Sequence, residues 1–120
     1  MSKKIKPVAK SGKKQMPRFL TIGILGGMGP EATSHFFSLL VKTGDVARDQ
    51  DHVPIVVYSY PQMPDRVESI LHGGPTPLPM MIAVVESLRL AGADFVVIPC
   101  ITAHYFHSAI AAKSKIPLVN

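Results

Sequence analysis

The chain has 120 residues, enough for one domain of ordinary size, and it is 47% hydrophobic and 18% charged, as soluble globular proteins are. No apolar run approaches the ~20 residues of a membrane span, and no signal peptide is recognisable. We therefore expect a cytoplasmic protein without a membrane partner. The single cysteine, Cys100, excludes an internal disulfide.

The positive charge is concentrated at the N-terminus. Residues 1–18 contain seven basic side chains and no acidic one, whereas residues 19–120 contain six basic and eight acidic ones, a net charge of −2. A Lys-, Ser- and Gly-rich segment cannot bury enough apolar surface to order itself, so we predict that residues 1–18 form a disordered extension and residues 19–120 the domain. The extension lacks interleaved aromatic residues, so no specific nucleic-acid partner is expected, although weak binding to anionic surfaces is compatible with its charge.

The first half of the domain starts with a strand signal and continues with a helix signal. Residues 19–25 form a short, β-branched apolar run, which predicts a buried strand. A glycine-rich turn follows, and then Pro30 and Glu31 favour the first turn of a helix that can end at Gly44. Its expected apolar face consists of Phe36, Phe37, Leu40 and Val41.

The second half repeats this alternation. Residues 61–79 are rich in Pro and Gly, which predicts a long surface loop with a short helical turn. The regular elements expected around this loop are strands at 53–60 and 95–98, helices at 78–90 and 102–113, and the start of a fourth strand at 116–119.

Alternating strands and helices, with strands that are apolar on both faces, predict an α/β fold. We expect a parallel sheet of about four strands with helices on both faces, of the Rossmann-like or flavodoxin-like kind. In such sheets ligands bind outside the carboxyl ends of the strands. Three loops should meet there: 26–30, 60–66 and 100–104.

The glycine turn has two functional interpretations. Residues 27–32, GMGPEA, fit the G-x-G-x-x-A pattern of a dinucleotide site. However, Pro30 lacks the N–H that a pyrophosphate would need, and Glu31 brings negative charge to the same place. Binding of a substrate carboxylate by backbone N–H groups is the favoured interpretation, with a purely structural turn as the alternative.

Two other loops carry reactive or charged side chains. Cys100 lies at a strand end before a helix, a position that favours the reactive thiolate over a buried apolar role. Arg66 could hold a carboxylate bidentately or be a solvated loop charge. Cys100, His104 and His107 share one face, but no further ligand completes a metal set; we expect no metal and interpret His104 as lining the site.

Three segments in order resemble the aspartate/glutamate racemase family. GILGGMGPEAT at 23–33 is similar to the family's opening, PQMPDR at 61–66 to its arginine loop, and GADFVVIPCITAHYF at 92–106 to its first catalytic-cysteine segment. The RDQDH run at 48–52 also matches. The resemblance covers essentially all of residues 19–120 and identifies them as an N-terminal half.

The resemblance implies a cofactor-independent amino-acid racemase built of two similar α/β halves, each giving one cysteine. One thiolate removes the α-proton of aspartate or glutamate, and the other thiol returns a proton to the opposite face. Cys100 would be the thiol of this half and Arg66 would bind a substrate carboxylate. Met28, Gly29 and Thr102 would hold the α-carboxylate.

Two positions depart from the family pattern. Ile101 stands where the family commonly has Asn after the cysteine, and Tyr60 stands where it often has Asn before the arginine loop; both correspond to substrate contacts. With one thiol, the chain alone should exchange an α-proton without inversion. The alternatives are a non-catalytic amino-acid or dicarboxylate binding module, a nucleotide-binding domain, or a truncated gene remnant. We also expect self-association through surface that a second half would cover.

Overall fold

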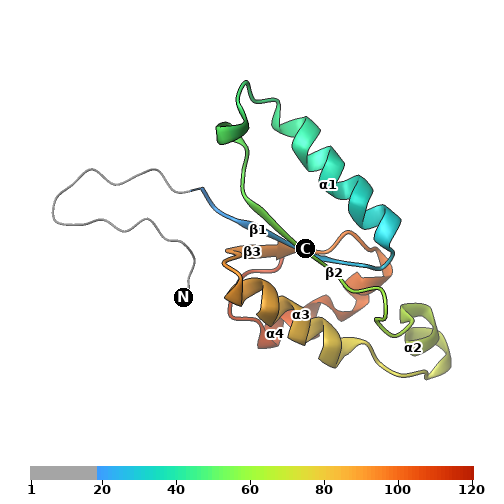
Figure 1. Cartoon of the computed structure of the whole chain (residues 1–120). Coiled ribbons are helices and arrows are strands. Elements are labelled where there is room, and N and C mark those ends of the chain that lie inside the picture. Colours follow the sequence, from blue (N-terminus) through green and yellow to red (C-terminus); the bar gives the residue numbers. More distant parts are fainter. Residues whose placement is uncertain (1–18) are drawn as a thin grey trace.

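The computed structural model describes residues 19–120, so the predicted extension at 1–18 lies outside the described residues. Its centre is a parallel sheet in the order β2-β1-β3 (Figure 1). The strands are β1 (Ile22–Gly26), β2 (Ile55–Ser59) and β3 (Phe95–Val97). Ile22 of β1 is in register with both Ile55 and Phe95, so the three parallel strands begin together and their carboxyl ends point to the same edge, although the pairing of β3 stops at Val97, opposite Ile24.

The helices cover the two faces of this sheet unequally. Helix α1 (Pro30–Gly44) lies on one side, whereas α3 (Leu78–Leu90) and α4 (His107–Lys113) lie on the other (Figure 1). The remaining elements are α2 (Arg66–His72) and two short 3-10 helices, η1 (Asp49–Asp51) and η2 (Thr102–Phe106). The predicted α/β class, with a parallel sheet between helices, is confirmed.

The hydrophobic core lies between the sheet and the α3–α4 layer. Helix α3 begins and ends at the residues predicted for it, and it buries Met81, Val84, Val85 and Leu88 against the strands. Gly23 of β1 permits this close approach, because a Cβ there would lie 2.8 Å from the Cβ of Ala93. Val96 of β3, Ile98 directly after that strand and Ile110 of α4 complete the layer.

The apolar face predicted for the first helix is only partly covered. Thr33, near the N-terminus of α1, is the helix's single buried residue, whereas Phe37 and Val41 are 41% and 39% exposed. Phe36 and Leu40 are half-buried. Two of the four residues predicted for the apolar face are therefore exposed, and within residues 19–120 α1 buries only Thr33, in its first turn.

Two predicted elements differ in the structure. The fourth strand is reduced to one bridge, in which Val96 donates to the carbonyl of Pro117 and accepts from Val119. Pro117 has no N–H with which to extend the ladder. The predicted helix at 102–113 is divided into η2 and α4, because burial of Phe106 and a bond from His104 to the carbonyl of Ile98 hold its first turn against the strand end.

No helix among residues 19–120 combines the length and the apolar character that a membrane crossing requires.

Candidate active site at the carboxyl ends of the strands

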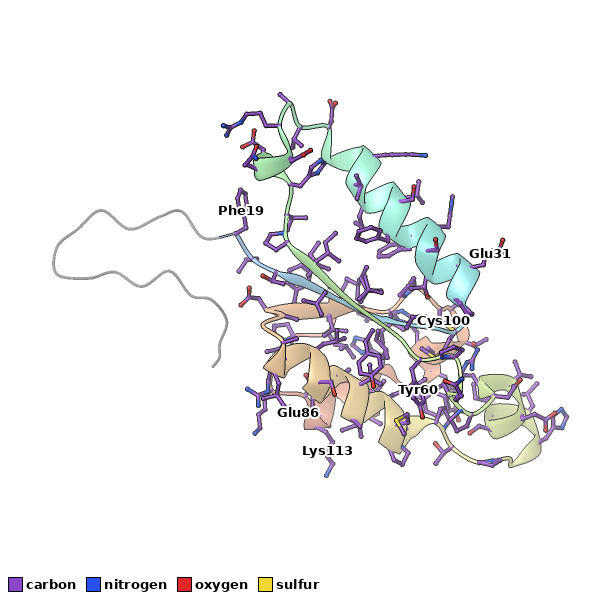
Figure 2. All side chains as sticks on the ribbon, viewed as in Figure 1. Phe19, Glu31, Tyr60, Glu86, Cys100 and Lys113 are labelled. Carbon is purple, nitrogen blue, oxygen red and sulfur yellow. The ribbon has the colours of Figure 1, made fainter. Side chains whose placement is uncertain are left out.

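The three loops predicted to meet do gather at the carboxyl edge of the sheet. The N–H of Tyr60, directly after β2, donates to the carbonyl of Gly26 at the end of β1 (3.1 Å). Met28 and Met63, from two of these loops, are both buried in the core, and α2 contacts η2. Figure 2 shows Tyr60 and Cys100 at this edge, near the first turn of α1.

The glycine turn is fixed by Thr33. Its hydroxyl accepts a hydrogen bond from the N–H of Gly27 (2.8 Å) and donates one to the carbonyl of Gly29 (2.9 Å). Gly27 has a φ of 100°, and a Cβ there would lie 2.7 Å from the carbonyl oxygen of Tyr60, so the turn needs glycine. Sequence analysis did not single out Thr33, because a threonine in a first helical turn usually needs no special explanation.

The hydrogen bonds of Thr33 also show which N–H groups of the turn are left without an acceptor. The N–H of Gly27 is occupied by Thr33, whereas the N–H groups of Met28 and Gly29 have no acceptor within residues 19–120. Gly29 is exposed and immediately precedes α1, whose first-turn N–H groups lack intrahelical partners. These donors form a positive patch suited to a carboxylate.

Cys100 is half-buried beside this patch, at the end of the strand that begins at Phe95. Its Sγ lies 3.4 Å from the hydroxyl of Thr102, and its own N–H donates to the carbonyl of Ile98 (2.8 Å). Either the hydroxyl or the thiol can be the donor in this contact. The helical segment after the cysteine begins at Thr102, as predicted, but its first turns are the 3-10 helix η2.

His104 is hydrogen-bonded to the backbone just before the cysteine. Its Nε2 lies 3.0 Å from the carbonyl oxygen of Ile98, which also accepts from Cys100. Its ring stacks on that of His107, whose Nε2 lies 3.2 Å from the carbonyl oxygen of Leu118. The histidine pair thus holds two chain segments together. Residues 19–120 contain no group of three side chains suited to hold a metal ion.

Arg66 begins α2, which is capped by the carboxylate of Asp65 accepting from the N–H of Glu68 (2.9 Å). One terminal nitrogen of Arg66 donates to the carbonyl of Pro64 (3.3 Å), while Nε is buried and has no hydrogen-bond partner. A buried donor without an acceptor costs free energy, so this guanidinium is ready to bind an oxygen ligand.

The remaining predicted site residues differ in exposure. Tyr60 is half-buried and its ring packs edge-to-face on Tyr58, with centroids 6.1 Å apart. Thr102 is exposed, and Ile101 is 92% exposed, so its side chain extends away from the described fold. The cysteine side of the site is therefore an open surface. A hollow of about 250 Å³ lies elsewhere, between α1 and the start of β2.

The fold and this edge define the class of protein: an α/β domain that brings a thiol, a guanidinium and free backbone donors together where parallel strands end. The sequence profile of the Asp/Glu/Hydantoin racemase family matches residues 25–120. The chain belongs to this family.

Similar proteins agree with that assignment. The broad specificity amino-acid racemase RacX of Bacillus subtilis (strain 168) is 30% identical in an alignment 106 residues long, and the match covers 82% of this chain and 44% of RacX. The aspartate racemase of Picrophilus torridus superposes with a TM-score of 0.78 at 34% identity, over 84% of this chain and 43% of that one.

An aspartate racemase homologue from Pyrococcus horikoshii OT3 has the same fold, with a TM-score of 0.69 at 20% identity, over 83% of this chain and 44% of that one. The chain thus spans about half the length of the relatives that it matches.

Proposed function

We propose that this chain forms one half of a cofactor-independent amino-acid racemase, with Cys100 as its acid/base thiol and aspartate or glutamate as the substrate. The observation that carries the proposal is the joint placement, at one edge of the sheet, of Cys100, the free N–H groups of the Met28–Gly29 turn and the unpartnered Nε of Arg66. Membership of the racemase family supports it.

Substrate binding would use two kinds of donor. The α-carboxylate would accept from the N–H groups of Met28 and Gly29, aided by the hydroxyl of Thr102. Arg66 would hold the second carboxylate of a dicarboxylic amino acid, whose oxygen would satisfy its buried Nε. Tyr60 and Ile101 would complete the surroundings of the substrate with a phenol and an apolar side chain.

The chemical step is a proton transfer at carbon. The Cys100 thiolate would take the α-proton and become a thiol, leaving a carbanion whose charge spreads onto the carboxylate. Donors that already point at that carboxylate would stabilise the carbanion without reorganising. Inversion needs a second acid on the opposite face, so this chain alone should return the proton to the face from which it came.

The test is exchange of the α-proton in deuterated water. Incubated with L-aspartate or L-glutamate, the purified 120-residue chain should replace the α-proton signal with deuterium while the L configuration is retained. Proton NMR follows the exchange and chiral chromatography follows the configuration. Cys100→Ser should abolish exchange, because the hydroxyl is too weak an acid to form the base at neutral pH.

A matched pair of arginine variants tests substrate binding. Arg66→Lys keeps the charge but loses the planar fork, so the KM for exchange should rise about tenfold, as expected for loss of about 1.4 kcal/mol. Arg48→Lys, at an exposed arginine paired with Asp51 by a 2.8 Å contact, should leave KM unchanged.

Saturable binding of the amino acid without exchange of its α-proton would instead establish the binding module. Racemisation by the purified chain that requires Cys100 would contradict the half-site proposal.

A further inference from the structure

The turn that carries Cys100 is closed at one backbone carbonyl. The N–H of Cys100 donates to the carbonyl of Ile98 two residues earlier (2.8 Å), which makes a three-residue turn centred on Pro99. The same carbonyl oxygen lies 3.0 Å from Nε2 of His104. Ile98 therefore accepts from the backbone of the cysteine and from the side chain of His104, so the imidazole ring holds the turn from the helical segment that follows it.

The ring of His104 is itself held at two points. A carbonyl oxygen can only accept, so Nε2 of His104 carries a hydrogen whether the ring is neutral or charged. The ring also stacks on that of His107, with centroids 5.9 Å apart and an interplanar angle of 10°. His107 is fixed in turn by the carbonyl oxygen of Leu118, 3.2 Å from its Nε2, and Ala103 and Phe106 on the same segment are buried. The donor nitrogen of His104 therefore has a fixed position relative to the sheet.

The side chain of Cys100 has few other contacts that could fix it. Cys100 is half-buried, and within residues 19–120 the hydroxyl of Thr102 is the one polar group in contact with its Sγ, at 3.4 Å. Thr102 is exposed and Ile101 is 92% exposed, so neither neighbour encloses the thiol. The direction in which the Cα–Cβ bond of Cys100 leaves the chain is therefore set by the turn at 98–100.

We propose that His104 is a positioning residue for Cys100 and acts through the carbonyl of Ile98. This role rests on the proposed function, in which the thiol exchanges a proton with the α-carbon of a bound amino acid. Reacting atoms must lie about 3–3.5 Å apart, and a misplacement of about 1 Å can cost about a hundredfold in rate. No hydrogen bond within residues 19–120 links His104 to the turn at 27–29 or to Arg66. Loss of the His104 donor should therefore affect the transfer step more than substrate binding.

The first experiment measures α-proton exchange by the 120-residue chain in deuterated water, with L-aspartate as the substrate. His104→Phe keeps a ring in the stack but removes the donor, so kcat should fall about tenfold with little change in KM. His104→Gln places an amide N–H close to the position of Nε2 and should restore most of kcat. The proposal is wrong if the glutamine variant is as slow as the phenylalanine variant, or if KM rises by as large a factor as kcat falls.

His107→Phe is the matched control. It removes an equivalent hydrogen bond, to the carbonyl of Leu118, from the neighbouring ring of the stack. Urea unfolding should show similar losses of stability for His104→Phe and His107→Phe, whereas only His104→Phe should lower kcat. Equal losses of kcat in the two variants would show that His104 serves the stability of the fold alone and would overturn the proposal.

A second measurement tests the position of the thiol without any substrate. The NMR couplings between Hα and Hβ of Cys100 report its χ1 rotamer. The wild type, His104→Gln and His107→Phe should show the couplings of a single rotamer, and His104→Phe should show averaged couplings. If the wild type exchanges no α-proton but the couplings change in this way, the proposed function fails and the positioning role stands. Identical couplings in all four proteins would overturn the positioning role, whatever the exchange rates are.

Discussion

The two faces of the sheet are built from equally apolar residues but are covered to different extents. On the α3–α4 side, Leu25 and Val96 meet two helices and are fully buried. On the α1 side, Ile24 is fully buried at the centre of the sheet, while its edge neighbour Val57 is 41% exposed. The position of the helix, rather than the hydrophobicity of the strand, decides how much apolar surface is removed from water.

The comparison shows what each side contributes. The α3–α4 side supplies most of the stability, because it contains nearly the whole buried cluster. The α1 side carries the candidate site, since the turn that Thr33 fixes lies where α1 begins. Much of the rest of that side is exposed within residues 19–120, including Phe37, Val41 and Val57.

The largest expected effect is the difference in stability between two matched leucine substitutions. Leu88→Ala in α3, at a residue that is 1% exposed, should lower the free energy of unfolding by about 2–5 kcal/mol through lost burial and a cavity. Leu39→Ala in α1, at a residue that is 43% exposed, should lower it by less than about 1 kcal/mol. Urea unfolding measures both free energies, and equal losses would contradict the statement that the α3–α4 side supplies most of the stability.

A pair of glycine substitutions tests the turn. Gly27→Ala should cost about 2–3 kcal/mol, because alanine disfavours a φ of 100° and its Cβ would collide with the backbone of Tyr60. Gly73→Ala also meets a positive φ, of 68°, but its Cβ would touch nothing within 4 Å, so about 1 kcal/mol is expected. Similar losses in urea unfolding would show that the contact with Tyr60 is unimportant.

Thr33→Val should have the next largest effect. It leaves the buried N–H of Gly27 without an acceptor, which costs about 1–2 kcal/mol and should loosen the turn. Thr43→Val, near the exposed end of α1, removes a hydroxyl that donates to the exposed carbonyls of Leu39 and Leu40, and it should change stability by less than about 0.5 kcal/mol. If Thr33→Val raised the KM for α-proton exchange while Thr43→Val did not, the turn would be implicated in substrate binding.

The smallest effect is expected at the surface ion pair on α3. Hydrogen bonds from Arg89 to Glu86, one of them 3.0 Å long, lower the pKa of the Glu86 carboxyl. A lowered pKa in the folded state means that this contribution to stability is present above the ordinary glutamate pKa and is lost as pH falls through the lowered value. Glu86→Gln should slightly reduce the dependence of the free energy of unfolding on pH in this range. The effect is small because exposed ion pairs contribute little. A large change in the free energy of unfolding at neutral pH would be inconsistent with a small contribution from this ion pair.

The meeting of the three loops could be predicted from the sequence, because it depends on local pattern and topology. Parallel strands had to end at one edge, so the loops that carry Met28, Arg66 and Cys100 had to approach one another. The exposure of Ile101 and the use of the Gly27 N–H by Thr33 could not be foreseen, because both depend on how separate segments are oriented after packing.

By itself, the sequence determined the α/β alternation, the bounds of α3 and the sheet edge at which the candidate site lies, because hydrophobic period and turn residues act over short distances. Tertiary structure alone decided that β2 lies at the sheet's edge, that the fourth strand shrinks to a bridge and that α1 covers its face only at one end. Periodicity specifies which side of an element is apolar; what covers that side depends on segments distant in the chain.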